Sequence, residues 1–376
     1  MFKASLQASD LSMDQFPENT LGSATQIIQA GDDSWVEAHM AIIGIPDGRL
    51  SIGNEDTESA PTAIRKELFA LAAHKADMKI VDLGDLKIGK SPADTLAAIK
   101  FVSAELMKES VIPIWIGGSM GFCLGQYTSF DEISRNVECT VVSPRVELEG
   151  DGYLRKISLH EPNVLFNLNV LAYQSHYVTN QSVMALHKMY FNTVRLGMLR
   201  SKIQEIEPVV RNTDMFAFDV GAIKHADAPG NSQSNPNGLL AEEACQLSWY
   251  AGVSEKLRSF GVYECNPKLD TRDQTSKLTA QMIWYFVDGY YHRKGDLPGL
   301  HSEFVRYRCT MEDNSPDIIF FKSKRTNRWW MEIPDPKSFG NTGRNIQIPC
   351  SYTDYEMATR GEMPDRFWEA LQKMSH

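Results

Sequence analysis

Short apolar runs alternate with longer amphipathic stretches along most of the chain. The runs lack polar alternation and end in polar, glycine-containing or acidic segments, which is typical of strands buried on both faces of a parallel sheet. The stretches between them place apolar residues at helical spacing, so the pattern predicts an α/β protein. The predicted strands are Met40–Ile45, Lys79–Asp85, Val111–Gly118, Cys139–Val142, Asn163–Gln174, Met215–Val220 and Phe260–Pro267; the predicted helices are Ser59–Leu68, Pro92–Ser110, Glu242–Leu257 and Leu278–Tyr291, and Met184–Leu199 holds a helix and a strand-like run.

The chain after residue 301 follows a different pattern. Asp317–Lys322 and Arg328–Ile333 flank a short polar turn, which predicts an antiparallel hairpin, and Pro364–Met374 is predicted as a terminal helix. No flexible Gly/Ser linker precedes them. We therefore divide the chain into an N-terminal segment (1–35), a main domain (36–301) and a C-terminal extension (302–376) packed on that domain.

The C-terminal extension is rich in large aromatic residues and carries a short basic cluster. Because so much aromatic surface is costly to leave in water, we expect alternate aromatic residues to bury against the main domain and the others to expose an apolar or basic patch. Such a patch predicts a protein partner or a homo-oligomer, and a solvated hairpin tip is the alternative for the basic cluster. The aromatic residues are Phe320, Phe321, Trp329, Trp330, Phe367 and Trp368, and the cluster is Lys322, Lys324, Arg325 and Arg328.

Composition narrows the class of protein further. The chain has 376 residues, 43% of them hydrophobic and 23% charged, so it can bury one large α/β domain or two ordinary ones. A formal charge of −10 gives no basic footprint for nucleic acid or an anionic membrane. No apolar run approaches the roughly 18 residues that a membrane span needs, so no membrane insertion is expected. Six cysteines without a Cys-x-x-Cys pair are interpreted as reduced core thiols of a cytoplasmic protein.

Candidate chemistry begins at the predicted strand Met215–Val220. Asp219 lies at the end of that run, and open α/β sheets bind their ligands at the carboxyl ends of strands. Taken alone, Asp219 also fits a residue that merely caps the next turn. The motifs Asp227-Ala-Pro-Gly230, Pro236-Asn-Gly-Leu239 and Glu242-Glu-Ala-Cys245 follow it. In these motifs the chain resembles the ureohydrolases (arginase, agmatinase and formimidoylglutamase), and it resembles the formimidoylglutamases most.

The resemblance covers residues 40–300 and implies a three-layer α/β/α fold with a mostly parallel sheet. It also implies a site in which six positions hold two manganese ions. Of these positions, Asp219 keeps its carboxylate and Glu147 has one that is longer by a methylene group. The other four are Met120, Ser143, Arg145 and Gly221, none of which offers the carboxylate or imidazole that a hard dication needs. We therefore expect no metal cofactor.

Glu264 is the residue that the resemblance places on the substrate side of this site. It stands in Glu264-Cys-Asn-Pro267, which is similar to the family motif whose glutamate grips the cationic end of the substrate. A structural ion pair is the alternative role for Glu264.

The loss of four metal positions favours a catalytically inactive member of the family with a binding or assembly role. Arg328-Trp-Trp-Met-Glu332 in the extension resembles metal-less homologues from bacteria with gliding or type IX secretion systems, so a link to that machinery is expected from the resemblance. The alternative is an active hydrolase of C–N bonds in linear amidines such as formimidoylglutamate, using a rebuilt metal site or metal-free chemistry.

Three acidic residues at this site need a counter-ion if no metal is bound. Glu147, Asp219 and Glu264 would repel one another in a partly buried cleft. We expect Arg145 to pair with Asp219 or Glu147 as an internal counter-ion, with Lys224 as the second candidate cation, so that the metal centre becomes a structural salt bridge.

Overall fold

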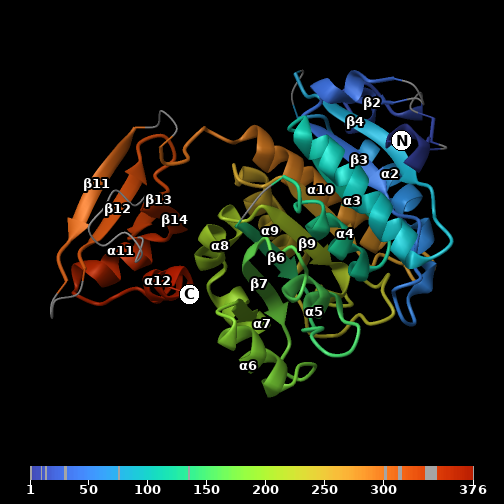
Figure 1. Cartoon of the computed structure of the whole chain (residues 1–376). Coiled ribbons are helices and arrows are strands. Elements are labelled where there is room, and N and C mark those ends of the chain that lie inside the picture. Colours follow the sequence, from blue (N-terminus) through green and yellow to red (C-terminus); the bar gives the residue numbers. More distant parts are fainter. Residues whose placement is uncertain are drawn as a thin grey trace.

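The computed structural model describes residues 2–9, 11–12, 15–28, 32–74, 77–133, 136–299, 303–311, 316–334 and 345–375. Its main domain has three layers, with helices on both faces of a ten-stranded sheet (Figure 1). This architecture confirms the fold predicted from the sequence.

The central sheet is parallel except at one edge, where β1 runs antiparallel to β4. Its strand order is β1-β4-β3-β5-β10-β9-β6-β7-β8, with β2 also paired to β4. The strands are β1 (Leu6–Gln7), β2 (Thr25–Ile27), β3 (Met40–Gly44), β4 (Ile80–Leu86), β5 (Ile112–Ile116), β6 (Val137–Val142), β7 (Leu165–Tyr173), β8 (Asn192–Arg195), β9 (Met215–Asp219) and β10 (Ser259–Tyr263). The N-terminal segment thus contributes two short strands to the main sheet.

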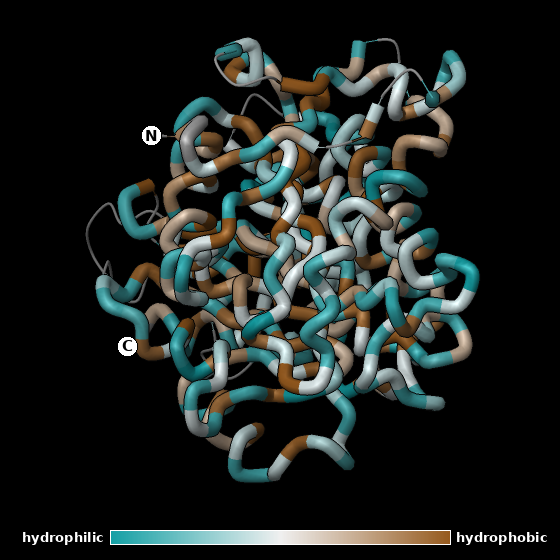
Figure 2. Tube along the Cα trace, turned by 90° about the vertical axis from the view of Figure 1, so that its right-hand side faces the viewer, coloured by the Kyte–Doolittle hydropathy of each residue, from teal (hydrophilic) through white to brown (hydrophobic). Residues whose placement is uncertain are grey.

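Two hydrophobic clusters cover the two faces of this sheet. Alternate residues of one strand point to opposite clusters, as Ile42 and Ile43 of β3 do. One face packs on α2 (Ala60–Phe69), α7 (Leu196–Ser201), α8 (Glu207–Arg211), α9 (Ala241–Val253) and α10 (Gln274–Tyr291). The other packs on α3 (Pro92–Lys108), α4 (Cys123–Thr128), α5 (Tyr153–Ser158) and α6 (Asn180–Lys188). Figure 2 shows hydrophobic segments running through the interior and hydrophilic ones on many outer loops.

Local sequence signals explain where these elements begin. Helix α3 starts with Pro92 just inside its first turn, and Ser91 and Asp94 form a reciprocal capping box ahead of it. All six cysteines are buried and unpaired, as the sequence predicted. Within the described residues, no helix is long and apolar enough to cross a membrane.

The C-terminal extension folds into its own small α/β unit. An antiparallel sheet has the order β11 (Phe304–Cys309), β12 (Ile318–Ser323), β13 (Trp329–Ile333) and β14 (Ile346–Cys350), and the chain continues into α11 (Tyr352–Thr359) and α12 (Asp365–Ser375). The predicted hairpin is β12–β13. The two outer strands and α11 were not predicted, because their residues mix apolar and polar side chains without a clear period.

Three of the six predicted aromatic residues bury inside the extension, and Trp330 buries against the main domain as expected. Phe320, Trp329 and Phe367 belong to a separate hydrophobic cluster of the extension, so the expectation that they pack on the main domain is wrong. Trp330 points to the other face of the small sheet, where it meets Arg211 of α8. Trp368 is 50% exposed.

The basic hairpin turn also contacts the main domain. Arg325 donates a hydrogen bond to the carbonyl oxygen of Lys294, and Arg328 forms ion pairs with Glu207 at 3.5 Å and Asp296 at 3.9 Å. A solvated tip therefore does not describe these two arginines, which hold the extension in place.

Arg211 makes a buried contact between the two parts. Its Nη2 donates to the carbonyl oxygens of Trp329 (3.1 Å) and Cys350 (3.4 Å), and its guanidinium lies 4.3 Å from the centroid of the Trp330 ring. An ion pair with Glu207 at 2.8 Å balances its charge. A buried cation with this many partners fixes the position of the small sheet on α8.

Arg211→Ala is therefore expected to lower the free energy of unfolding by about 3–5 kcal/mol, because it removes the closer ion-pair partner of Glu207 and the hydrogen bonds to two carbonyl oxygens. Chemical denaturation measures the loss, and limited proteolysis should show faster cleavage within residues 303–375. Arg155→Ala, on an exposed position of α5, is the control. A loss below about 1 kcal/mol would show that Arg211 is not the anchor.

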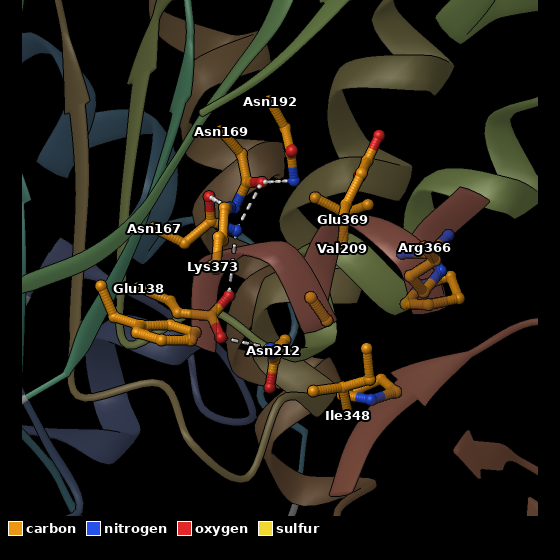
Figure 3. A pocket seen from close by; sticks show the side chains of 14 residues that line it. Glu138, Asn167, Asn169, Asn192, Val209, Asn212, Ile348, Arg366, Glu369 and Lys373 are labelled. Carbon is orange, nitrogen blue, oxygen red and sulfur yellow. Dashed lines mark hydrogen bonds between the residues drawn. The ribbon is translucent and has the colours of Figure 1, made fainter. Parts of the chain in front are cut away.

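A second contact lies at the amino ends of β6 and β7 (Figure 3). Lys373 of α12 points into a small polar cavity of about 50 Å³ and donates a hydrogen bond to Oδ1 of Asn167. Glu138 lies in the same cavity and accepts from Asn212. Burial lowers the pKa of Lys373 to about 8, although Glu138 opposes the shift, and burial raises the pKa of Glu138.

This shift makes the docking of α12 dependent on pH. A lysine whose pKa is lower in the folded than in the unfolded protein destabilises the fold while charged, and that cost disappears as the pH rises from about 8 towards its ordinary value near 10.5. Wild-type protein should therefore gain stability relative to Lys373→Met between pH 7 and pH 10, as measured by thermal unfolding. Lys66→Met, at an exposed position of α2, should show no such trend. A difference that stays flat or reverses would contradict this assignment.

Candidate functional site

Four neighbouring strands bring the predicted site residues together. β5, β10, β9 and β6 lie side by side in parallel, so their carboxyl ends meet at one edge of the sheet. Met120 follows β5, Glu264 follows β10, Asp219 ends β9, and the segment from Ser143 to Glu147 follows β6. Met120, Arg145, Glu147 and Glu264 line a cleft of about 770 Å³ there.

Glu264 is held by the protein's own donors. Its carboxylate accepts hydrogen bonds from Ser51 Oγ (2.6 Å), Asn54 Nδ2 (2.9 Å) and the backbone nitrogen of Met120 (2.7 Å). Its backbone has a left-handed φ of 68°, which is uncommon for a residue with a side chain and is maintained only where surrounding contacts compensate. The sequence did not indicate Ser51 and Asn54, because they come from the loop after β3, far from Glu264 in the chain.

Asp219 has a structural partner as well. Its Oδ1 accepts a hydrogen bond of 2.7 Å from the backbone nitrogen of Gly221, which caps the short 3₁₀ turn Val220–Ala222. The capping role considered for Asp219 is thus present. A Cβ atom on Gly221 would lie 2.9 Å from Asp219 Oδ1, so the turn in this form leaves little room for a side chain there.

Burial sets the charge state of the three acidic residues. It raises the pKa of Asp219 well above its usual range, and the charge of Glu264 adds to the effect. Burial also raises the pKa of Glu264, while its hydrogen bonds with Ser51 and Asn54 oppose the shift. Glu147 lies at the exposed rim, and its pKa is raised by loss of water and by Glu264. Among the three side chains, Glu147 is exposed, whereas Asp219 and Glu264 are half-buried.

Two further side chains lie near the ancestral metal positions. The phenol of Tyr153, from α5, and the thiol of Cys123, from α4, are both buried. Burial raises the pKa of each well above its usual range, and the charges of Glu147 and Asp219 add to both shifts. Each group is therefore neutral and brings no anionic ligand to the site. The sequence did not predict a role for Tyr153 or Cys123, because both have the pattern of ordinary core residues of a helix.

Arg145 does not form the predicted salt bridge. Among the described residues, no ion pair within 4.0 Å joins Arg145 to Glu147, Asp219 or Glu264. Its Nε instead donates to Oε1 of Gln233 at 3.0 Å, and its guanidinium lies 4.4 Å from the centroid of the Tyr177 ring. The expected internal counter-ion is therefore wrong as a direct partner, although the charge of Arg145 still lowers the pKa of Glu147 and Asp219.

The physical reason is that other donors already hydrogen-bond to Glu264 and Asp219. Glu264 already accepts from Ser51, Asn54 and a backbone amide, and Asp219 accepts from Gly221. Lys224, the second candidate cation, pairs with Asp227 at 3.5 Å rather than with Asp219.

The fold is that of an open α/β protein. In this class the ligand site lies at the carboxyl ends of the parallel strands, where the strand order switches. The family model described as the Arginase family matches residues 38–141 and 163–288. The chain belongs to the arginase family.

Individual relatives place the chain beside the formimidoylglutamases. It is 23% identical to the formimidoylglutamase of Halobacterium salinarum over 66% of this chain and 87% of that protein, and 23% identical to that of Bacillus subtilis over 66% and 86%. The crystal structure of the Bacillus subtilis enzyme gives a TM-score of 0.66 at 21% identity, covering 77% of this chain and 97% of that one. Trypanosoma cruzi formiminoglutamase with Mn²⁺ gives 0.64 at 19%, covering 70% and 97%.

The residues present here do not fit a pair of manganese ions. Arg145 brings a permanent cation to one ligand position, and Met120 brings a thioether to another. The third ligand position is Gly221, which has no side chain and whose backbone amide donates to Asp219. The fourth position offers only the hydroxyl of Ser143. Within the part of the chain that the structure describes, no three His, Cys, Asp or Glu residues are grouped so that they could hold a metal ion.

The raised pKa of Asp219 gives a test of this arrangement. A carboxyl group whose pKa is higher in the folded protein stabilises the fold below its unfolded pKa, and that contribution is lost as the pH rises through the folded value. Asp219→Asn keeps an oxygen for the Gly221 amide but cannot ionise. The variant should therefore gain stability relative to wild type between pH 5 and pH 8 in thermal unfolding. A relative loss over that range would mean that Asp219 is stabilised in its charged form.

Proposed function

We propose that this arginase-family protein is a metal-independent binding protein and not a dimanganese hydrolase. The observation that carries the proposal is the position of Arg145, a fixed guanidinium beside Asp219 and Glu147 in the loop where the family resemblance expects metal ligands. Its charge acts on both carboxyl groups, so it would also repel a dication bound between them.

The chemical cost of losing the metals supports the same conclusion. Metal coordination lowers the pKa of water from 15.7 to about 7, so its absence removes about 8–9 units of nucleophile ionisation, on the order of 11 kcal/mol. Tyr153 and Cys123 are held neutral by burial, and Glu264 is already hydrogen-bonded by the protein. None of them is placed to generate a comparable nucleophile.

The cleft itself supports a binding role. Its volume of about 770 Å³ falls in the range of small-molecule sites, and its walls combine apolar and charged side chains. The C-terminal extension supplies a second surface for a protein partner or for another copy of the chain, with Trp368 50% exposed on α12. A link to gliding or type IX secretion machinery remains part of the proposal, supported by the resemblance of the extension.

Metal content and turnover decide between this proposal and an active amidine hydrolase. The protein is expected to retain far less than one manganese ion per chain after loading and desalting, by elemental analysis, and to release no formamide, ammonia or urea from formimidoylglutamate, agmatine or arginine. The formimidoylglutamase of Bacillus subtilis serves as the positive control for the assay. Stoichiometric manganese together with turnover would overturn the proposal.

A variant that rebuilds the site provides the matched comparison. Met120→His, Ser143→Asp, Arg145→His and Glu147→Asp together restore four of the ligand types that the resemblance implies, and Gly221 is kept because its turn leaves little room for a side chain. Because the strand ends that position them are intact, the combined variant should bind manganese more tightly than wild type. Equal retention in both proteins would show that these side chains are not what excludes the metal.

A further inference from the structure

The guanidinium of Arg145 is held in place by the protein but forms no ion pair with an acidic residue among those that the structure describes. Gln233 accepts the hydrogen bond from Nε, and the ring of Tyr177 supports its flat face at 4.4 Å. Tyr177 is fixed in turn by a hydrogen bond to Asn235. No described residue accepts a hydrogen bond from Nη1 or Nη2 of Arg145, and these atoms are not sealed inside the protein.

The free nitrogen atoms belong to the cleft. Arg145 is only partly buried and lines the cavity of about 770 Å³ together with Tyr177. An arginine that is stacked and hydrogen-bonded through Nε keeps a planar fork of N–H groups, which matches the two oxygens of a carboxylate. Because the side chain is already ordered, binding such an anion costs less conformational entropy than ordering a free arginine would.

An apolar wall lies in the same cleft. Ile52 is 89% exposed and Leu50 is 39% exposed, although both line the cavity. Leu96, Leu124 and Val178 continue the wall. Aliphatic side chains presented to solvent at the edge of a pocket favour an occupant with an apolar body.

The acidic residues of the cleft limit how much negative charge the occupant can carry. Glu149 and Asp151 are exposed, so water and salt screen them, and Asp151 also has Lys156 at 3.7 Å. The carboxylate oxygens of Glu264 already accept hydrogen bonds from the protein. Glu147 also lines the cleft and its carboxyl group interacts with the charge of Arg145, so it adds to the repulsion of an anion. A single carboxylate therefore meets less repulsion at Arg145 than a dianion such as a phosphate monoester.

We propose that the cleft binds an organic monocarboxylate with an apolar body, and that Arg145 holds the carboxylate through its two terminal nitrogen atoms. The inference rests on the proposed function, because a metal centre beside Arg145 would change the charge of the site. A position that served a cation in the ancestral site thereby becomes an anion site in this chain.

The test compares an acid with its own amide on chelator-treated full-length protein. Calorimetric titration with 4-phenylbutyrate should give saturable binding, and 4-phenylbutyramide, which has the same shape without the charge, should bind at least about tenfold more weakly. Arg145→Gln should weaken acid binding by about 10- to 100-fold and leave amide binding nearly unchanged. Arg145→Lys should recover only part of the loss, since it keeps the charge and not the fork.

Two further variants separate the parts of the site. Ile52→Ser should weaken the acid and the amide alike, because it removes apolar contact only. Arg155→Gln, at an exposed position of α5 outside the cleft lining, should change neither. Circular dichroism checks that each variant is folded.

Equal binding of acid and amide, unchanged acid binding by Arg145→Gln, or no saturable binding of 4-phenylbutyrate to wild type would each overturn the inference. Failure of the proposed function has a different signature, namely bound manganese with turnover, which the titrations on chelator-treated protein do not report.

Discussion

The central constraint is that four parallel strands deliver their last residues to one edge of the sheet, where carboxylates collect with little water. Asp219 ends β9 and Glu264 directly follows the adjacent strand β10, and the charge of Glu264 raises the pKa of Asp219. In this chain, neutral hydrogen-bond donors stabilise the two carboxyl groups. Ser51, Asn54 and a backbone amide bind Glu264, and the amide of Gly221 binds Asp219. The rest of the site follows from this choice of donors.

Because neutral donors bind these carboxylates, Arg145 forms no salt bridge with them. If Asp219 had kept an unpaired carboxylate, attraction through a poorly solvated space would have drawn Arg145 towards it. Instead the Arg145 guanidinium stacks on Tyr177, which lines the cleft, and its Nε donates to Gln233. Its long-range charge still lowers the pKa of Asp219 and Glu147, so it remains part of the electrostatics of the site without being part of a salt bridge.

Sequence reasoning reached the scaffold because the scaffold depends on local patterns. Unbroken apolar runs predicted β5, β6 and β9, and parallel strands necessarily gather Met120, Arg145 and Asp219 at one edge. It failed for the direction of the Arg145 side chain, which depends on Gln233 and on donors distant in the chain. It also failed for the core of the extension, because the strands β11 and β14 carry mixed residues that only tertiary packing explains.

The same strands carry the cleft at one end and the extension at the other. Glu138 stands near the start of β6, where Lys373 of α12 enters the polar cavity (Figure 3). Arg145 follows the other end of that strand. Asn167, at the amino end of β7, accepts the hydrogen bond from Lys373, and Arg211 of α8 makes a second contact with the extension. Neither contact uses a residue that lines the cleft. A partner held by the extension and a ligand held by Arg145 would therefore occupy separate surfaces, and any coupling between them would have to pass along the strands of the central sheet.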